Sequence, residues 1–308
     1  MNTKQDIKFK LIDLLLILGI LLPLALCIVL NVITEPASEG ITLTGARIFF
    51  TIHMPIQDFP ITESQVNSAA VVISLFFLCL FLTHGIKEKP ESVRQHIAEY
   101  IVEKTEELVQ DNMGKYFMSF APFIAAIMCL SLLSSLLSLV GLFPPTSDIN
   151  IVAGWAILVF IIITHYKLKC GPLYYLKGFT EPVVLFTPLN IIGEIATPVS
   201  MSFRHFGNVL SGTVISVLIS AALQGLSIKL LGWLPGVLGQ FPFLQIGLPA
   251  VFSIYFDVFS GCLQAFIFAM LTMLNISNAF PQEDYIARQR RKAERKAERR
   301  KARERAKA

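Results

Sequence analysis

Charged residues are scarce in this sequence, and the shortage decides its class. Asp, Glu, Lys and Arg make up 16% of the 308 residues, whereas hydrophobic residues make up 54%. A soluble domain usually has about 25% charged residues, because its surface has to face water. The composition therefore excludes an ordinary soluble domain and predicts a protein that crosses a membrane several times.

Cysteine pairs and the motifs of metal or nucleotide sites are also missing. Only five cysteines occur, spread along the chain, which excludes a small secreted domain held together by disulfides. The sequence has no Cys/His spacing typical of a metal site, no phosphate-binding loop and no nucleophile motif. We therefore expect no cofactor, no metal and no catalytic chemistry from this chain by itself.

Six hydrophobic runs are long enough to cross a bilayer, which takes about 20 apolar residues in a helix. The first run could be a cleaved signal peptide, but its length favours a retained helix. The last two runs are each about 40 residues long, so each is either a helical hairpin or one strongly tilted helix. The six runs are 11–33, 66–85, 117–143, 149–165, 186–226 and 241–280.

The distribution of Lys and Arg separates these two alternatives. Both residue types are concentrated before the first run, after the second, after the fourth and in the C-terminal tail, and they are rare in the other loops. Basic loops favour the cytoplasmic side, so the alternation requires each long run to cross once. We predict an all-α, polytopic membrane protein with about six helices and both termini in the cytoplasm. Its last two helices, 186–226 and 241–280, should be long and strongly tilted.

Two further segments lie outside the hydrophobic runs. Residues 90–114 have apolar side chains at helical spacing, which indicates an amphipathic helix at the cytoplasmic interface; a short soluble helix is the alternative. Residues 286–308 carry 12 Lys and Arg against 3 Glu and no aromatic residue that could stack on bases. This tail favours anionic lipid headgroups over nucleic acid. The expected organisation is an N-terminal segment with an extra helix (1–33), an external loop (34–65), a core (66–285) and the basic tail (286–308).

Polar residues inside the two long runs are the candidate functional residues, because an Arg at mid-membrane costs at least ~2.5–3.5 kcal/mol. Helical spacing places many of them on stripes with small residues, which let another helix approach closely. The first stripe is Ser200, Arg204, Asn208 and Gly212, and the second is Asp257, Ser260, Gly261 and Gln264. Other polar residues in these runs are Asn190, Glu194, His205, Asn275 and Asn278.

Two of these residues have a purely structural alternative. A salt bridge between Arg204 and Asp257 could join two packed helices, although it would not explain the Ser and Gly residues around it. His205 points about 100° away from Arg204 around the helix. We expect His205 to pack or to form a hydrogen bond rather than to relay protons.

Residues 198–212 resemble the signature of subunit a of the F-type ATP synthase, in which Pro, Ser and Arg are followed by Phe-Gly-Asn and Gly. Residues 263–272, with their Gln-Ala-Phe core, are similar to the last helix of that family. The loop 143–150 resembles bacterial members, and residues 60–67 resemble the entry to the first core helix. The resemblance covers about residues 50–285 in the right order.

The resemblance implies a fold and a function. Subunit a packs two long helices against the c-ring and supplies two aqueous half-channels, so that ion flow drives ring rotation and ATP synthesis. Arg204 matches the family's essential arginine, and Asn208 and Gln264 match positions that orient it. The implied partners are the c-ring, the peripheral-stalk subunit b, the remainder of the complex and membrane lipid. The implied location is a bacterial plasma membrane, and the ion, H⁺ or Na⁺, depends mainly on the ring.

The sequence departs from the better-known bacterial pattern at several positions, one of which is Gly141, where some members carry Asp. Thr213 stands where some members carry Glu, and Asp257 stands where those members carry His. We therefore expect Asp257 to line the half-channel on the non-cytoplasmic side and Glu194 to line the cytoplasmic one, with Ser200 on the face of Arg204. Two rival functions remain open. One is a self-contained transporter or channel with an Arg–Asp gate, for which internal repeats would be typical, and the other is a membrane scaffold.

Overall fold

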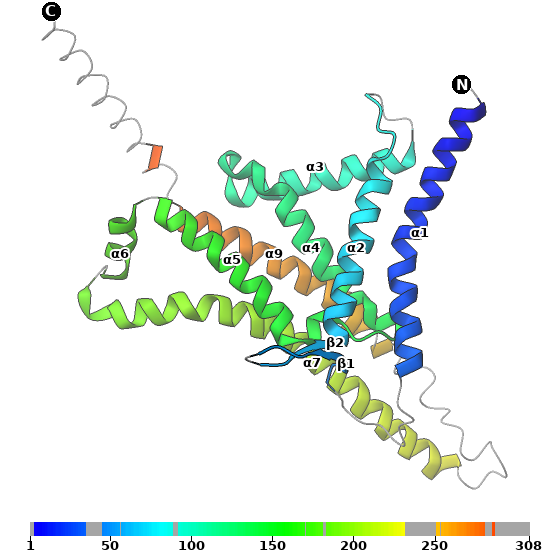
Figure 1. Ribbon diagram of the computed structural model, residues 1–308. Helices are drawn as coiled ribbons and strands as arrows, with labels where there is room; N and C mark the ends of the chain where they lie inside the picture. The colour runs from blue at the N-terminus through cyan, green and yellow to red at the C-terminus, as the bar shows by residue number, and fades with distance from the viewer. Residues whose placement is uncertain are drawn as a thin grey trace, which may run out of the picture.

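Helices make up most of the computed structural model, as the sequence predicts (Figure 1). The structure describes residues 3–34, 45–55, 57–88, 92–169, 171–180, 183–231, 251–252, 254–280 and 285–286. The α-helices are α1 (Thr3–Thr34), α2 (Glu63–Thr83), α3 (Val93–Met113), α4 (Ala121–Leu136), α5 (Ile149–Lys169), α6 (Pro172–Thr180), α7 (Thr187–Leu231) and α9 (Gly261–Ala279). Short 3₁₀ segments are Lys115–Phe120, Leu137–Val140, Pro145–Ser147 and Val184–Phe186, and Ile254–Ser260 is a π-helix.

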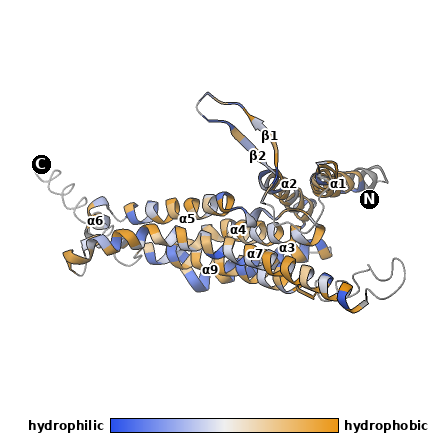
Figure 2. Cartoon of the chain, turned by 90° about the horizontal axis from the view of Figure 1, so that it is seen from below, coloured by the Kyte–Doolittle hydropathy of each residue, from blue (hydrophilic) through white to orange (hydrophobic). Residues whose placement is uncertain are grey.

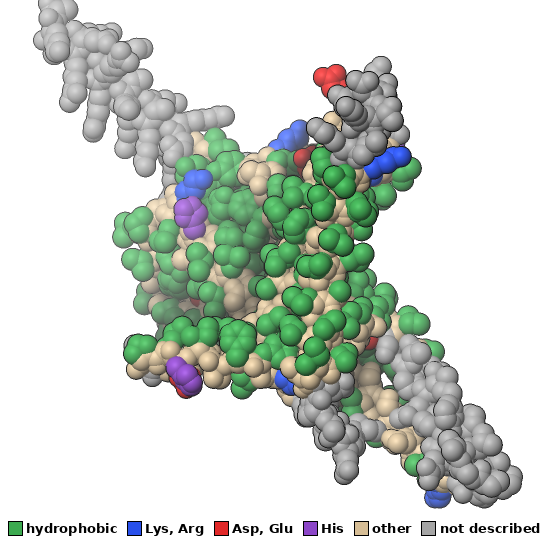
Figure 3. All heavy atoms as spheres, turned by 45° about the vertical axis from the view of Figure 1, so that its right-hand side comes forward, with side chains coloured by type: hydrophobic (Ala, Val, Ile, Leu, Met, Phe, Trp, Pro, Cys, Tyr) green, Lys and Arg blue, Asp and Glu red, His purple; other side chains and the backbone are tan. Residues whose placement is uncertain are grey.

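Within the described residues, six helices are long and apolar enough to cross a membrane. They are Phe9–Thr34, Glu63–Thr83, Lys115–Val140, Ile149–Lys169, Val184–Leu230 and Ile254–Ala279. Hydrophobic side chains dominate the face that Figure 3 shows, and Lys and Arg lie toward its ends. Because a helix satisfies its own backbone hydrogen bonds, such segments are stable in lipid. The chain is a multi-pass membrane protein.

A β-hairpin lies within the region that the sequence suggested only as a loop, 34–65. Strands β1 (Ile48–Ile52) and β2 (Phe59–Thr62) pair antiparallel, and Figure 2 shows the hairpin extending away from the helices. Arg47 Nε lies 3.1 Å from Glu63 Oε2, so an ion pair fixes the base of the hairpin to the first turn of α2.

The extra N-terminal helix α1 lies along α2 (Figures 1 and 2). Gly19 allows the close approach, because a Cβ there would lie 2.6 Å from the ring of Phe77. Ser74 Oγ donates a hydrogen bond to the carbonyl of Ile20 at 2.9 Å. Small residues and interhelical hydrogen bonds are the usual means of joining helices in lipid, where burial of apolar surface gives no driving force.

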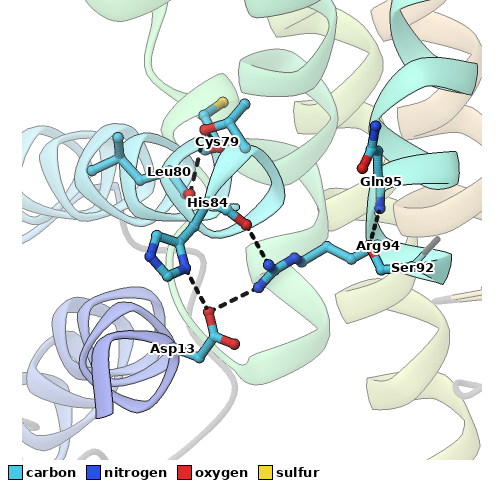
Figure 4. A network of polar contacts seen from close by, with 8 residues as sticks. Asp13, Cys79, Leu80, His84, Ser92, Arg94 and Gln95 are labelled. Atoms are coloured by element: carbon cyan, nitrogen blue, oxygen red, sulfur yellow. Dashed lines mark hydrogen bonds and ion pairs between the residues drawn. The ribbon is translucent and has the colours of Figure 1, made fainter. Parts of the chain in front are cut away.

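A charged network joins α1 to the end of α2 and the start of α3 (Figure 4). The Asp13 carboxylate oxygen Oδ1 lies 2.8 Å from Arg94 Nη1 and 3.1 Å from His84 Nδ1. Arg94 also donates to the carbonyl of His84, and its guanidinium lies 5.0 Å from the ring centroid of Phe81. The Asp13 carboxylate inside the first hydrophobic run is thereby paired.

Helix α3 is the predicted amphipathic helix 90–114. Ser92 Oγ accepts a hydrogen bond from the backbone N–H of Gln95 at 3.2 Å and so caps its start. Gly114, with a φ of +81°, ends it. Val109 is fully buried against the core, while most of the outer side is exposed. Figure 1 shows α3 turned steeply away from the direction of α2. A position at the cytoplasmic interface remains a prediction.

The packed core lies between α4, α5 and α9. Its most deeply buried side chains include Phe117, Ile124, Val159, Phe268 and Met273, each at most 2% exposed. Helix α7 lies against this core with one side, and the rest of its surface is exposed or half-buried. A large part of α7 is therefore open to lipid or to another subunit.

The fifth hydrophobic run forms one helix, as predicted, and not a hairpin. Helix α7 has 45 residues, which corresponds to ~68 Å, about twice the hydrocarbon thickness of a bilayer. Figure 1 shows α7 strongly inclined to α1 and α2. A helix of this length fits a membrane only when it is tilted.

The last hydrophobic run differs from the predicted continuous helix 241–280. Residues 241–250, and the basic tail beyond residue 286, lie outside the described residues. The described part is a π-helix, Ile254–Ser260, that continues into α9. A π-helix accommodates extra backbone within a helical run and is often found at functional sites. Here the π-helix ends at Ser260, which contacts α7. A run of hydrophobic residues does not indicate whether its helix is an α-helix or a π-helix.

Candidate functional site

Helix α7 packs against the π-helix and α9, which brings the two predicted stripes together. Asn208 and Ser260 exchange two hydrogen bonds: Asn208 Nδ2 donates to Ser260 Oγ at 2.8 Å, and Ser260 Oγ donates to Asn208 Oδ1 at 2.9 Å. One turn further along α7, Gly212 is buried against Phe256, and a Cβ there would lie 3.0 Å from Phe256 Cβ. The small residues thus allow the close contact that the sequence predicts.

Arg204 is exposed on α7, one turn before Asn208. Its guanidinium forms no hydrogen bond or ion pair with any residue that the structure describes. The predicted alternative of an Arg204–Asp257 salt bridge is therefore wrong; Asp257 lies half-buried in the π-helix. Because α7 and α9 run antiparallel, Gln264, one turn beyond Ser260, lies near the height of Arg204, and it is 5% exposed.

The stripe on α7 is not uniformly buried. Ser200 and Arg204 are exposed, Asn208 is half-buried and Gly212 is buried. Residues four apart advance by about 40° around a helix, so this row winds from the outer surface into the contact with α9. Arg204 consequently lies at the edge of the helix pair, where it can reach a group outside this chain.

His205 lies on the opposite side of α7 and points into the core. It is fully buried, and its Nε2 lies 3.3 Å from Ser131 Oγ. The rings of Trp155 and Phe268 approach it edge-to-face, with centroids 6.0 and 5.6 Å away. The prediction that His205 packs and forms a hydrogen bond is confirmed.

Glu194 lies in a polar cavity at the N-terminal end of α7. Its Oε2 lies 2.5 Å from Lys167 Nζ, and its Oε1 accepts a hydrogen bond from the Tyr175 hydroxyl at 3.3 Å. Burial, and then the negative charge of Glu194, raise the pKa of Tyr175, so this hydroxyl keeps its proton and donates. The cavity has a volume of about 460 Å³. Residues of α5, α6, α7 and α9 line it: Lys167, Tyr175, Gly178, Phe179, Leu189, Asn190, Gly193, Glu194, Asn278 and Ala279.

A second cavity, of about 170 Å³, lies beside the first, and Lys167 and Glu194 line both. Thr197 and Asn275 line only the second. Thr197 precedes Arg204 by seven residues, which is two turns, or ~10 Å, on the same side of the helix. On α7 the two cavities extend as far as Thr197, two turns before Arg204.

Two members of this cavity were missed by the sequence analysis. Lys167 entered it only as a mark of the cytoplasmic side, and Tyr175 lies in α6, for which no element was predicted. Its position two residues after the fourth hydrophobic run, 149–165, was the available signal for Lys167. Its pairing with Glu194, 27 residues away, depends on the packing of α5 against α7.

Together, these features define a class of protein. It is a polytopic membrane protein in which a long tilted helix carries an arginine without a partner among the described residues, beside a series of polar cavities. Four helices, α5, α6, α7 and α9, contribute the polar residues, and polar residues inside membrane helices are typical of proteins that move ions across membranes.

The chain belongs to the ATP synthase A chain family, whose model matches residues 66–277. It is 31% identical over 231 residues to ATP synthase subunit a of Trichlorobacter lovleyi, covering 72% of this chain and 90% of that protein. It is 29% identical over 236 residues to ATP synthase subunit a of Geobacter sulfurreducens, covering 74% and 93%. Over 274 residues it is 27% identical to "ATP synthase subunit a, sodium ion specific" of Propionigenium modestum, covering 79% and 87%. These findings confirm the resemblance to subunit a of the F-type ATP synthase.

Proposed function

We propose that this chain is the stator subunit of the Fo sector and that it carries H⁺ or Na⁺ between two half-channels by way of the c-ring. Ion flow through this path turns the ring and so drives ATP synthesis in the rest of the complex. Membership of the ATP synthase A chain family supports this function. The observation that carries it is Arg204, which is exposed and has no partner among the described residues.

Arg204 has the properties of a fixed charge between two half-channels. A guanidinium does not lose its proton in proteins, so its charge is permanent. It favours the ionised form of a ring carboxylate that passes it, and it repels a cation that would cross directly. The Asn208–Ser260 pair holds α7 against the π-helix and fixes the height of Arg204, and Gln264 supplies a polar group near that height.

The two half-channels are assigned to opposite sides of Arg204 along α7. Glu194 and its cavities line the cytoplasmic one, and Asp257 in the π-helix lines the other. Ser200 shares the exposed side of Arg204, which faces the c-ring together with apolar side chains such as Phe203, 58% exposed. The distribution of Lys and Arg supports a cytoplasmic position for both termini. The proposed location is a bacterial plasma membrane, with subunit b as a further partner. The chain itself catalyses no reaction.

The rival transporter with an Arg–Asp gate lacks its central contact, because Arg204 and Asp257 form no ion pair. The structure offers no other observation in its favour. A membrane scaffold would tolerate the loss of Arg204, whereas the proposed stator subunit would not. One experiment therefore separates these two functions.

The test is Arg204→Ala in the complete complex, with ATP-driven ion pumping measured in everted membrane vesicles. We expect pumping to fall by at least about tenfold, because the ring carboxylate loses its counter-charge. The matched control is Lys229→Ala, which removes an exposed cation from the last turn of the same helix. Pumping at the control level in an assembled Arg204→Ala complex would disprove the proposed function.

A further inference from the structure

We propose that the Lys167–Glu194 ion pair is a charge gate between the two cavities of the cytoplasmic half-channel. Lys167 acts through its own charge: its ammonium, held beside Glu194, restrains cations, while neutral molecules pass. The inference rests on the proposed function for its place in ion transport. The gate itself is inferred from the two cavities, whose shared lining is Lys167, Glu194, Asn278 and Ala279, with the ion pair as its charged part.

The pair stands at the junction of three elements. Lys167 comes from the last turn of α5, Glu194 from the second turn of α7, and Tyr175 from α6. Both charged side chains line the larger and the smaller cavity, and both remain partly exposed. Asn278 and Ala279 also line both cavities, so Lys167 and Glu194 are the two charged side chains beside the passage from the larger cavity toward Thr197.

The ammonium of Lys167 occupies the position that a passing cation would take beside the Glu194 carboxylate. An approaching hydronium or metal cation must either displace the ammonium or approach against its electrostatic repulsion. This repulsion is strong where little water screens the two charges. A neutral solute of the same size meets no such barrier. The gate therefore discriminates by charge, and removing the positive charge of Lys167 should open it to cations.

The Lys167 ammonium has a second partner, the aromatic ring of Tyr175. Its Nζ lies 5.8 Å from the centroid of the Tyr175 ring, within the range of a cation–π contact. A lysine stem is long and flexible, so a small rotation transfers the ammonium from Glu194 toward this ring. Asn190 Nδ2 donates to the carbonyl of Phe179 at 2.8 Å and holds α6, and hence Tyr175, over the cavity.

The experiment measures access to the smaller cavity without relying on ion transport. Thr197→Cys is introduced into the complete complex after the native cysteines are replaced. Its labelling rate from the cytoplasmic side is then measured by mass spectrometry. The cationic probe is trimethylammonium-ethyl methanethiosulfonate, and the neutral probe is methyl methanethiosulfonate. The cationic rate divided by the neutral rate gives an access ratio that corrects for any general loosening.

Four variants of the pair decide the proposal. Lys167→Gln should raise the access ratio by about tenfold, equivalent to ~1.4 kcal/mol, and Lys167→Met should do the same. Lys167→Arg keeps the charge and should leave the ratio unchanged. Glu194→Gln breaks the ion pair but keeps the ammonium, so it should not raise the ratio.

An unchanged ratio in Lys167→Gln and Lys167→Met would overturn the gate, and so would an equal rise in Lys167→Arg. Labelling that rises equally for both probes would also overturn it, because it would show a steric plug. Arg204→Ala tests the proposed function separately. If that variant pumps normally while the ratio rises in Lys167→Gln, the gate stands and the motor function fails. If Arg204→Ala abolishes pumping while the ratio stays unchanged in Lys167→Gln, the proposed function stands and the gate is disproved.

Discussion

Arg204 and His205 are neighbours in the sequence but occupy opposite environments. Arg204 is exposed at the edge of the helix pair, and His205 is fully buried among aromatic rings. One residue corresponds to about 100° of rotation around a helix, so a single step along the chain separates the exposed side of α7 from the core. The side of α7 on which a residue lies, and not its position in the sequence, therefore decides whether it is exposed or part of the core.

Asn208 and Ser260 should be energetically coupled, since each is both donor and acceptor for the other. In a double-mutant cycle of Asn208→Ala and Ser260→Ala, we expect a coupling free energy of about 0.6–1.5 kcal/mol. Thermal denaturation of the purified complex in detergent measures it. Ser202→Ala is the control for Asn208→Ala, because the Ser202 hydroxyl bonds to Pro198 of its own helix. Coupling of Ser202 with Ser260 as large as that of Asn208 would contradict this assignment.

At the scale of elements, the contact between α7 and the π-helix depends on a residue without a side chain. A Cβ at Gly212 would lie 3.0 to 3.1 Å from Cβ and Cδ1 of Phe256, closer than ordinary packing allows. The π-helix supplies Phe256 at this place, and its wider turn turns Ser260 toward Asn208. The two contacts together hold α7 close to the π-helix.

Gly212→Val should therefore disturb the site without touching Arg204. We expect the complex to lose about 1–3 kcal/mol of stability from overpacking and ATP-driven pumping to fall several-fold. The control is Gly225→Val on the same helix, where a Cβ would meet no atom within 4 Å. Thermal denaturation and pumping are measured on both variants. Equal effects of the two substitutions would show that the loss comes from helix propensity alone.

At the scale of the whole molecule, the distribution of exposed surface indicates how the chain is used. Helix α7 has only one side against the core, and α1 is exposed along most of its length. Lipid can cover both, but an exposed arginine on α7 needs a partner or water. A second subunit against this side would satisfy it, in keeping with the proposed c-ring contact.

Purification of the tagged chain in mild detergent tests this assembly. Mass spectrometry should find a small two-helix subunit in stoichiometric excess, together with the ATPase subunits, because a ring contributes many copies. An unrelated tagged membrane protein from the same cells is the control for non-specific capture. A chain that elutes alone, under conditions that keep rotary complexes intact, would contradict the proposed partners.

The sequence alone determined the features that depend on local periodicity and composition. The membrane class, the six crossings and the long fifth helix follow from runs of apolar residues, and spacing along each helix predicts which polar residues share a side. The environment of Arg204 was predicted only in part. Helical spacing identified the stripe on which it lies, but spacing within one helix could not decide whether Arg204 pairs with Asp257.

Tertiary structure decided every feature that needs two distant segments. Ser260 meets Asn208 across 52 residues, and Lys167 meets Glu194 across 27. The π-helix beside α7, the hairpin β1–β2 and the paired cavities belong to the same group. Spacing within one helix fixes directions around its axis but not which neighbour it meets. That choice depends on how side chains of different helices fit together, and only the packed molecule shows it.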